Sequence, residues 1–121
     1  MVRGILIVDD SVQFCALAAE LLTDQGLEVL GLAADGAQAL AAVARACPEG
    51  ILLDVNLPGP DGFAVAASLA VACPQTPIVL TSAGVAHVPA SILNACAVAA
   101  FVPKQELAAA DLRRLFRPAD T

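Results

Sequence analysis

Short, continuous apolar runs constrain the fold of this chain more than any other feature. The run Ile5-Leu6-Ile7-Val8 is too short for a helix and is mostly β-branched. A strand without polar alternation is typical of a sheet covered on both faces, as parallel sheets are. Four more strands are predicted, at Leu27–Ala33, Ile51–Leu53, Pro77–Leu80 and Ala99–Val102.

Segments with helical periodicity lie between these runs. Ser11 is the predicted N-cap of the first helix, and Gly26 ends it. The apolar residues predicted to face the core from this helix are Phe14, Leu17, Ala18, Leu21 and Leu22. Four more helices are predicted: one from Asp35 or Gly36 to about Cys47, before Pro48, and others at Phe63–Val71, Val88–Ala95 and Leu107–Phe116.

Five strands that alternate with helices predict one α/β fold class. The expected architecture is a doubly wound, five-stranded parallel sheet with right-handed crossovers and helices on both faces. A chain of 121 residues fits a single domain over residues 1–121, with no output domain in this chain.

Composition excludes several classes of partner. A net charge of −6 makes the chain a poor match for nucleic acid or for an anionic membrane surface. No apolar run approaches the roughly 18 residues of a membrane span, so we expect a cytoplasmic protein. The four cysteines form no CxxC pair and are predicted to be reduced, mostly buried thiols: Cys15, Cys47, Cys73 and Cys96.

Polar side chains follow four of the five predicted strands, at the point where each strand ends. These positions belong to Asp9-Asp10, Asp54, Thr81-Ser82 and Lys104. In a doubly wound sheet, ligands bind outside the carboxyl ends of the strands. We therefore expect these side chains to form one site.

Three carboxylates at one edge repel each other, so the site must either raise a pKa or recruit a cation. Oxygen ligands without thiolate or imidazole suit Mg²⁺. Once a metal and Lys104 neutralise the oxygens of a phosphoryl group, a carboxylate can attack it. Asp54 is the predicted nucleophile because it ends the third strand before a Pro/Gly-rich loop, whereas Asp9 and Asp10 lie side by side as a metal-holding pair.

The joint pattern resembles the receiver domain of two-component response regulators, over essentially the whole chain. The resemblance implies a flavodoxin-like fold in which a sensor histidine kinase or a phosphotransfer protein donates a phosphoryl group from its histidine to Asp54. The residues that carry it are Asp9-Asp10, Asp54 with Pro58 and Asp61-Gly62 after it, Thr81-Ser82 and Lys104.

The resemblance also implies the ligands of the Mg²⁺ ion. Asp10 and Asp54 would bind the metal directly, and Asp9 would act through water. The backbone carbonyl of Asn56 would complete the protein ligands.

A switch follows from the same resemblance. Thr81 and Lys104 would contact the phosphoryl oxygens, and Phe101 matches the aromatic switch position that turns inward when the Thr81 hydroxyl moves. The fourth helix, fifth strand and fifth helix would then regulate a partner or an output domain. Phe101 is equally well explained as a core residue. The family often has Pro directly after the lysine, whereas here Pro103 precedes Lys104.

Hypotheses from other classes remain. A receiver-like interaction or dimerisation module would act without phosphorylation, but the intact acidic pair, Asp54, Thr81 and Lys104 favour the phospho-acceptor. Such a domain catalyses only its own phosphorylation and dephosphorylation and is not otherwise an enzyme. An aspartyl-phosphate hydrolase also uses an Asp nucleophile with Mg²⁺, but this chain has no residues to spare for a cap.

One predicted helix carries no charge. The segment 85–100 contains no Asp, Glu, Lys or Arg, so it either packs against another element or exposes an apolar patch. The hypothesis is a homodimer or partner contact through Val88, Ile92 and Leu93.

Overall fold

The strands form one five-stranded parallel sheet in the order β2-β1-β3-β4-β5. The computed structural model describes residues 2–57, 62–83 and 99–116. The order is that of flavodoxin-like doubly wound sheets, so the predicted fold class is confirmed. The strands are β1 (Val2–Val8), β2 (Val29–Ala33), β3 (Pro48–Asp54), β4 (Ile78–Ser82) and β5 (Ala100–Pro103).

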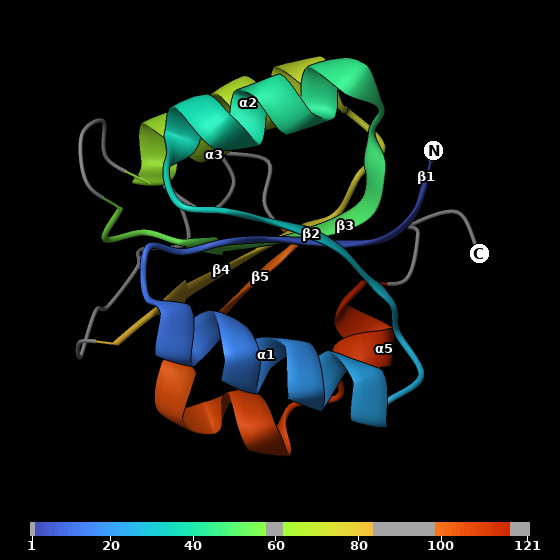
Figure 1. Cartoon of the computed structure of the whole chain (residues 1–121), viewed down its shortest axis with the longest axis vertical. Helices are drawn as coiled ribbons and strands as arrows, with labels where there is room; N and C mark the ends of the chain where they lie inside the picture. Colours follow the sequence, from blue (N-terminus) through green and yellow to red (C-terminus); the bar gives the residue numbers. More distant parts are fainter. Residues whose placement is uncertain (1, 58–61, 84–98, 117–121) are drawn as a thin grey trace.

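Helices cover both faces of the sheet (Figure 1). One layer contains α2 (Gly36–Arg45) and α3 (Gly62–Ala72). The opposite layer contains α1 (Val12–Asp24), the 3₁₀ helix η1 (Lys104–Ala109) and α5 (Leu112–Leu115). The predicted helix at 88–95, with its dimer hypothesis, and the loop residues Pro58 to Asp61 lie outside the described residues.

No helix in the described part of the chain is long and apolar enough to cross a membrane.

Each strand contributes side chains to two separate hydrophobic cores, one on each face of the sheet, because successive side chains point to opposite faces. In β1, Leu6 and Val8 pack under α2 and α3, whereas Ile5 and Ile7 pack under α1 and α5. All four side chains are at most 3% exposed. The continuous apolar run of β1 is therefore explained by burial on both faces.

The predicted N-cap Ser11 is confirmed, and Asp35, one of the two predicted starting residues of the second helix, is its N-cap. Ser11 Oγ accepts a hydrogen bond from Phe14 N at 3.2 Å, and Asp35 Oδ1 accepts one from Gln38 N at 2.8 Å. The burial of Leu17 was wrongly predicted, since Leu17 is 48% exposed. At about 100° per residue it lies on the flank of the buried stripe of α1, which consists of Phe14, Cys15, Ala18 and Leu22.

The predicted continuous helix at 107–116 is wrong. Ala110 has an extended backbone that separates η1 from α5, and Asp111 caps α5 by accepting from Arg114 N at 3.2 Å. Gln25, just after α1, bonds to both sides of the break. Its Nε2 donates to Ala110 O at 3.0 Å, and its Oε1 accepts from Leu112 N at 2.8 Å. A side chain more than 80 residues away in sequence thus stabilises the interruption.

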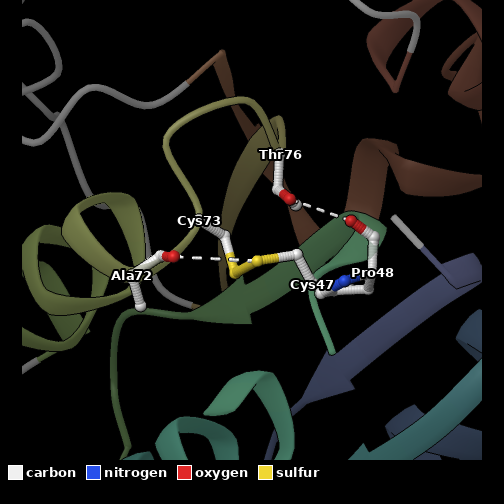
Figure 2. The surroundings of a disulfide bond; sticks show 5 residues. All are labelled: Cys47, Pro48, Ala72, Cys73 and Thr76. Carbon is white, nitrogen blue, oxygen red and sulfur yellow. Dashed lines mark hydrogen bonds between the residues drawn. A yellow bond between two sulfur atoms is a disulfide. The ribbon is translucent and has the colours of Figure 1, made fainter. Parts of the chain in front are cut away.

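The expectation that all four cysteines are reduced is also wrong. Cys47 and Cys73 form a disulfide (Figure 2). Cys47 lies between α2 and β3, and Cys73 follows α3, so the neighbouring strands β3 and β4 bring both junctions to the same edge of the sheet. Cys15 is a buried free thiol, as predicted, and Cys96 lies outside the described residues.

Gly62 begins α3 directly against β3, where it donates from its N–H to Val55 O at 3.1 Å. A Cβ at this position would collide with the Val55 backbone. We predict that Gly62→Ala lowers the free energy of unfolding by about 3 kcal/mol in urea denaturation, because backbone cannot yield as a flexible side chain can. Gly31→Ala is the control, since its Cβ would meet only Leu6 Cδ1 at 4.0 Å. A loss at Gly62 no larger than that at Gly31 would contradict the packing described.

Candidate functional site

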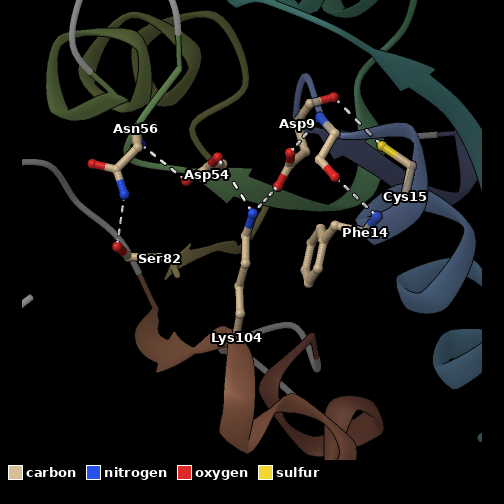
Figure 3. Close-up of polar contacts among 8 residues, drawn as sticks. Asp9, Phe14, Cys15, Asp54, Asn56, Ser82 and Lys104 are labelled. Atoms are coloured by element: carbon tan, nitrogen blue, oxygen red, sulfur yellow. Dashed lines mark hydrogen bonds and ion pairs between the residues drawn. The ribbon is translucent and has the colours of Figure 1, made fainter. Parts of the chain in front are cut away.

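The polar residues at the strand ends meet at one edge of the sheet (Figure 3). Asp9 directly follows β1, Asp54 ends β3, and Lys104 directly follows β5. Thr81 in β4 pairs with Asp54 in the parallel register. The carboxyl ends of four adjacent strands therefore supply the site, as the sequence predicted.

The two buried carboxylates are held in the same way. Asp9 Oδ1 accepts from Ser11 N at 2.8 Å, and Asp54 Oδ1 accepts from Asn56 N at 3.0 Å. Each bond is formed with the N–H two residues later, the local turn that Asp favours. Each Oδ2 is left facing Lys104. The residues Asp9 and Asp54 are 3% and 4% exposed.

Lys104 bridges the two carboxylates. Its Nζ lies 2.8 Å from Asp9 Oδ2 and 3.5 Å from Asp54 Oδ2, and only 17% of its side chain is exposed. Burial alone would lower the pKa of Lys104, but hydrogen bonding with Asp9 and the charge of Asp54 outweigh burial and raise that pKa. Lys104 is therefore firmly cationic at neutral pH.

The Phe14 ring lies beside the Lys104 ammonium. The Lys104 ammonium lies 4.2 Å from the centre of the Phe14 ring, within the range of a cation–π contact. Figure 3 shows the ring beside the lysine, on the α1 side of the site. The sequence predicted Phe14 only as a core residue. No sequence signal identifies this contact, because it needs the first turn of α1 to lie beside the end of β5.

One ammonium does not balance the acidic groups. Asp10 is exposed, and one carboxylate oxygen from each of Asp9, Asp10 and Asp54 lies within 4.8 Å of the others. Burial raises the pKa of Asp54 above its ordinary value, and repulsion by Asp9 adds to this, although the Asn56 N–H and Lys104 oppose it. With all groups ionised, three carboxylates and one ammonium leave a net negative charge.

The donor set fits a divalent cation. Mg²⁺ takes oxygen ligands at about 2.1 Å and usually keeps several waters, so a small cluster in which one carboxylate binds through water suits it. Asp9 Oδ2 is buried and, apart from the Lys104 ion pair, has no hydrogen-bond partner among the described residues. The acidic pocket of Asp9, Asp10 and Asp54 could therefore hold a metal ion.

Thr81 and Asn56 lie on the β4 side of the pocket. Thr81 is fully buried, and its Oγ1 has no hydrogen-bond partner within the part of the chain that the structure describes. A buried hydroxyl without a partner is costly, so it suits a site that binds an acceptor. The Asn56 side chain donates to Ser82 Oγ at 2.8 Å, which fixes the loop after Asp54 onto β4.

Phe101 is not part of this cluster. It is half-buried in β5 and packs against the core beneath α2 and α3. The sequence therefore placed Asp9, Asp10, Asp54 and Lys104 together correctly. The switch role of Phe101 stays a prediction.

Comparison with known proteins identifies a family over nearly the whole chain and curated relatives over about two thirds of it. The family model for the response regulator receiver domain matches residues 5–116. A protein-glutamate methylesterase/protein-glutamine glutaminase of Myxococcus xanthus is 41% identical over 83 residues, which cover 66% of this chain and 24% of that protein. The transcriptional regulatory protein TcrA of Mycobacterium tuberculosis is 40% identical over 79 residues, or 65% of this chain and 31% of that protein.

Solved structures share the fold. The chemotaxis protein CheY4 of Vibrio cholerae aligns with a TM-score of 0.79 at 28% identity, over 95% of this chain and 99% of that one. The response regulator domain of Thermotoga maritima CheB aligns with a TM-score of 0.81 at 20% identity, over 100% of this chain and 98% of that one. The matched part of the chain spans 24% and 31% of the lengths of the two curated relatives above.

The raised pKa of Asp54 gives the wild-type fold a defined pH dependence. The folded state holds this proton more tightly than the unfolded state, so stability is lost as pH rises through the folded pKa. We predict that Asp54→Asn raises the free energy of unfolding at pH 7, without divalent cations, by on the order of 1 kcal/mol.

The gain should disappear below the unfolded pKa, where Asp54 is protonated in both states. Denaturant unfolding at pH 7 and at about pH 3, roughly one unit below the ordinary Asp pKa, measures both effects. Glu20→Gln, at an exposed position of α1, is the control for removing a carboxylate. An Asp54→Asn protein that is less stable than the wild type at pH 7 would show that ionised Asp54 does not destabilise the folded state.

The contact between Phe14 and Lys104 predicts a specific effect on the ammonium. Phe14→Leu keeps an apolar side chain but removes the aromatic face, so the pKa of Lys104 should fall. Phe14→Tyr keeps the aromatic face, so the pKa of Lys104 should stay at its wild-type value. NMR titration of the Lys104 side chain measures this directly. Equal titration curves in Phe14→Leu and the wild type would show that the ring only packs.

Proposed function

Because the chain belongs to the response regulator receiver domain family, we propose that it is a phospho-acceptor that receives a phosphoryl group on Asp54. The donor would be the phosphohistidine of a sensor histidine kinase or of a phosphotransfer protein. In the reaction the P–N bond to the histidine breaks and a P–O bond to the Asp54 carboxylate forms. Such a partner would place the domain in the cytoplasm, and we assign residues 1–121 to one receiver domain.

The observation that carries the proposal is the position of Lys104 between two buried carboxylates. Asp54 Oδ2 faces the ammonium at 3.5 Å, while its Oδ1 is fixed by Asn56 N. A phosphoryl group on Asp54 would therefore arrive beside a positive charge, which stabilises the charge on its oxygens. The fixed Oδ1 also orients the carboxylate.

A Mg²⁺ ion would supply the remaining positive charge when bound, by neutralising the phosphoryl oxygens. Asp10 and Asp54 would bind it directly, Asp9 through water, and the Asn56 backbone carbonyl would complete the set. The exposure of Asp10 leaves the approach from solvent open. Displacement of the Lys104 ammonium from Asp9 would free the Oδ2 that now forms the ion pair.

Thr81 would connect phosphorylation to a change of surface. Its buried Oγ1 has no partner in the described residues and could donate to a phosphoryl oxygen. Movement of this hydroxyl would leave space that half-buried Phe101 could fill. A groove of about 460 Å³ beside Phe101, lined also by Val102, Glu106 and Arg114, supports an output surface at β5 and α5.

The direct test is the intact mass of the protein after incubation with acetyl phosphate and Mg²⁺. We predict a gain of one phosphoryl group that is lost in Asp54→Asn and on chelation of the metal. Lys104→Met, which keeps the apolar stem but removes the charge, should slow the gain at least tenfold, on the order expected for one charge contact to the transition state.

Glu20→Gln should be phosphorylated like the wild type, since this residue is exposed on α1. A gain that survives in Asp54→Asn would assign the acceptor elsewhere. No gain from any phosphoryl donor, by a folded protein that binds Mg²⁺, would favour an interaction module that works without phosphorylation.

A further inference from the structure

We propose that Cys47 and Cys73 form a reversible redox site, which dithiol reductants open and which closes again on oxidation. The proposal does not depend on phosphorylation of Asp54. It rests on the position of the two sulfurs, on the contacts that hold their junctions together, and on the difference in exposure between the two residues.

The disulfide encloses the part of the chain that carries the acceptor. Cys47 and Cys73 are 26 residues apart, and the loop between them contains β3, Asp54 and α3. The helix α3 begins at Gly62 near the site and ends at Ala72, next to Cys73. The disulfide thus ties the far end of α3 to the start of β3, as Figure 2 shows.

The two cysteines differ in exposure, so we expect a reductant to attack at Cys47. Cys47 is half-buried, whereas Cys73 is 1% exposed. A thiolate of the dithiol would attack the Cys47 sulfur, forming a mixed disulfide and releasing Cys73 as a thiolate that takes up a proton. The second thiol of the reductant then releases Cys47 and leaves as a cyclic disulfide. Two electrons pass from the dithiol to the cysteine pair.

The reduced pair would remain close together. The Thr76 hydroxyl donates to Pro48 O at 2.8 Å, and Thr76 N donates to Cys73 O at 3.1 Å. These bonds connect the two junctions independently of the sulfurs. Cys47 Sγ also lies 3.7 Å from Ala72 O, which could accept from the thiol of the reduced form. Because the cysteines stay near each other, re-oxidation needs no large rearrangement. A small disulfide oxidant would accept the two electrons and leave as two thiols while the Cys47–Cys73 bond forms again.

Cys15 provides an internal contrast. It is buried, at 5% exposed, and its Sγ donates to Asp9 O at 3.4 Å. A buried thiol that is already hydrogen-bonded is poorly accessible to a thiol reagent. Thiol chemistry in the folded protein should therefore occur at the disulfide rather than at Cys15.

Opening the disulfide should loosen α3 while the fold persists. The crosslink restricts the unfolded chain over a 26-residue loop, so its loss should lower Tm by roughly 10 °C. Amide hydrogen exchange in the last turn of α3 should become faster on reduction. Exchange in α1, on the opposite face of the sheet, should change little.

The experiment uses the full chain with Cys96→Ser, purified without reductant. Alkylation under denaturing conditions, followed by mass spectrometry, should find one free thiol, assigned to Cys15. Dithiothreitol applied to the native protein should raise the number to three, and glutathione disulfide should return it to one. The Tm should fall and recover in step.

The controls separate a redox site from a permanent crosslink. Cys47→Ser with Cys73→Ser should melt near the Tm of the reduced protein and should not respond to dithiothreitol, whereas Cys15→Ser should respond fully. Three free thiols before reduction would refute the proposal. So would reduction that needs denaturant, failure to re-oxidise, or a Tm that is unchanged when the disulfide opens.

Discussion

Repulsion among the carboxylates of Asp9, Asp10 and Asp54 is the constraint on which the rest of the site depends. Two of these groups are almost fully buried, and a single lysine bridges them. Burial makes each interaction stronger than it would be in water, so the cluster both destabilises the free protein and favours a cation. The raised pKa of Asp54 is the local sign of this conflict. Binding of a cation at this edge of the sheet would relieve the repulsion among the carboxylates.

The fold can sustain this repulsion because the sheet beneath the site is buried and apolar. The strands β1 and β3 are buried on both faces, and each buried aspartate is further fixed by a backbone N–H two residues along. The parallel register places Thr81 beside Asp54. At the other edge of the sheet, the Cys47–Cys73 disulfide and the hydrogen bond from the Thr76 hydroxyl to Pro48 O join the start of β3 to the segment after α3.

Local patterns predicted the strands, the cap at Ser11, the start of α2 and most of the acidic site, because apolar runs and strand ends depend on few residues. Long-range contacts could not be predicted in this way. The break at Ala110 depends on Gln25, the disulfide joins cysteines 26 residues apart, and the Phe14 ring reaches Lys104 only in the folded chain. Each of these contacts needs a tertiary placement that no periodicity encodes.

The most direct test of the account is whether the pocket binds a phosphoryl mimic together with Mg²⁺. Fluorine NMR with beryllium fluoride, a tetrahedral mimic that bonds to a carboxylate oxygen, gives separate signals for bound and free fluoride. Bound signals should appear only when both Mg²⁺ and Asp54 are present, and binding should be weaker in Lys104→Met. Free fluoride species alone, with a folded wild-type protein and saturating Mg²⁺, would contradict the assignment of this edge as a phosphoryl acceptor.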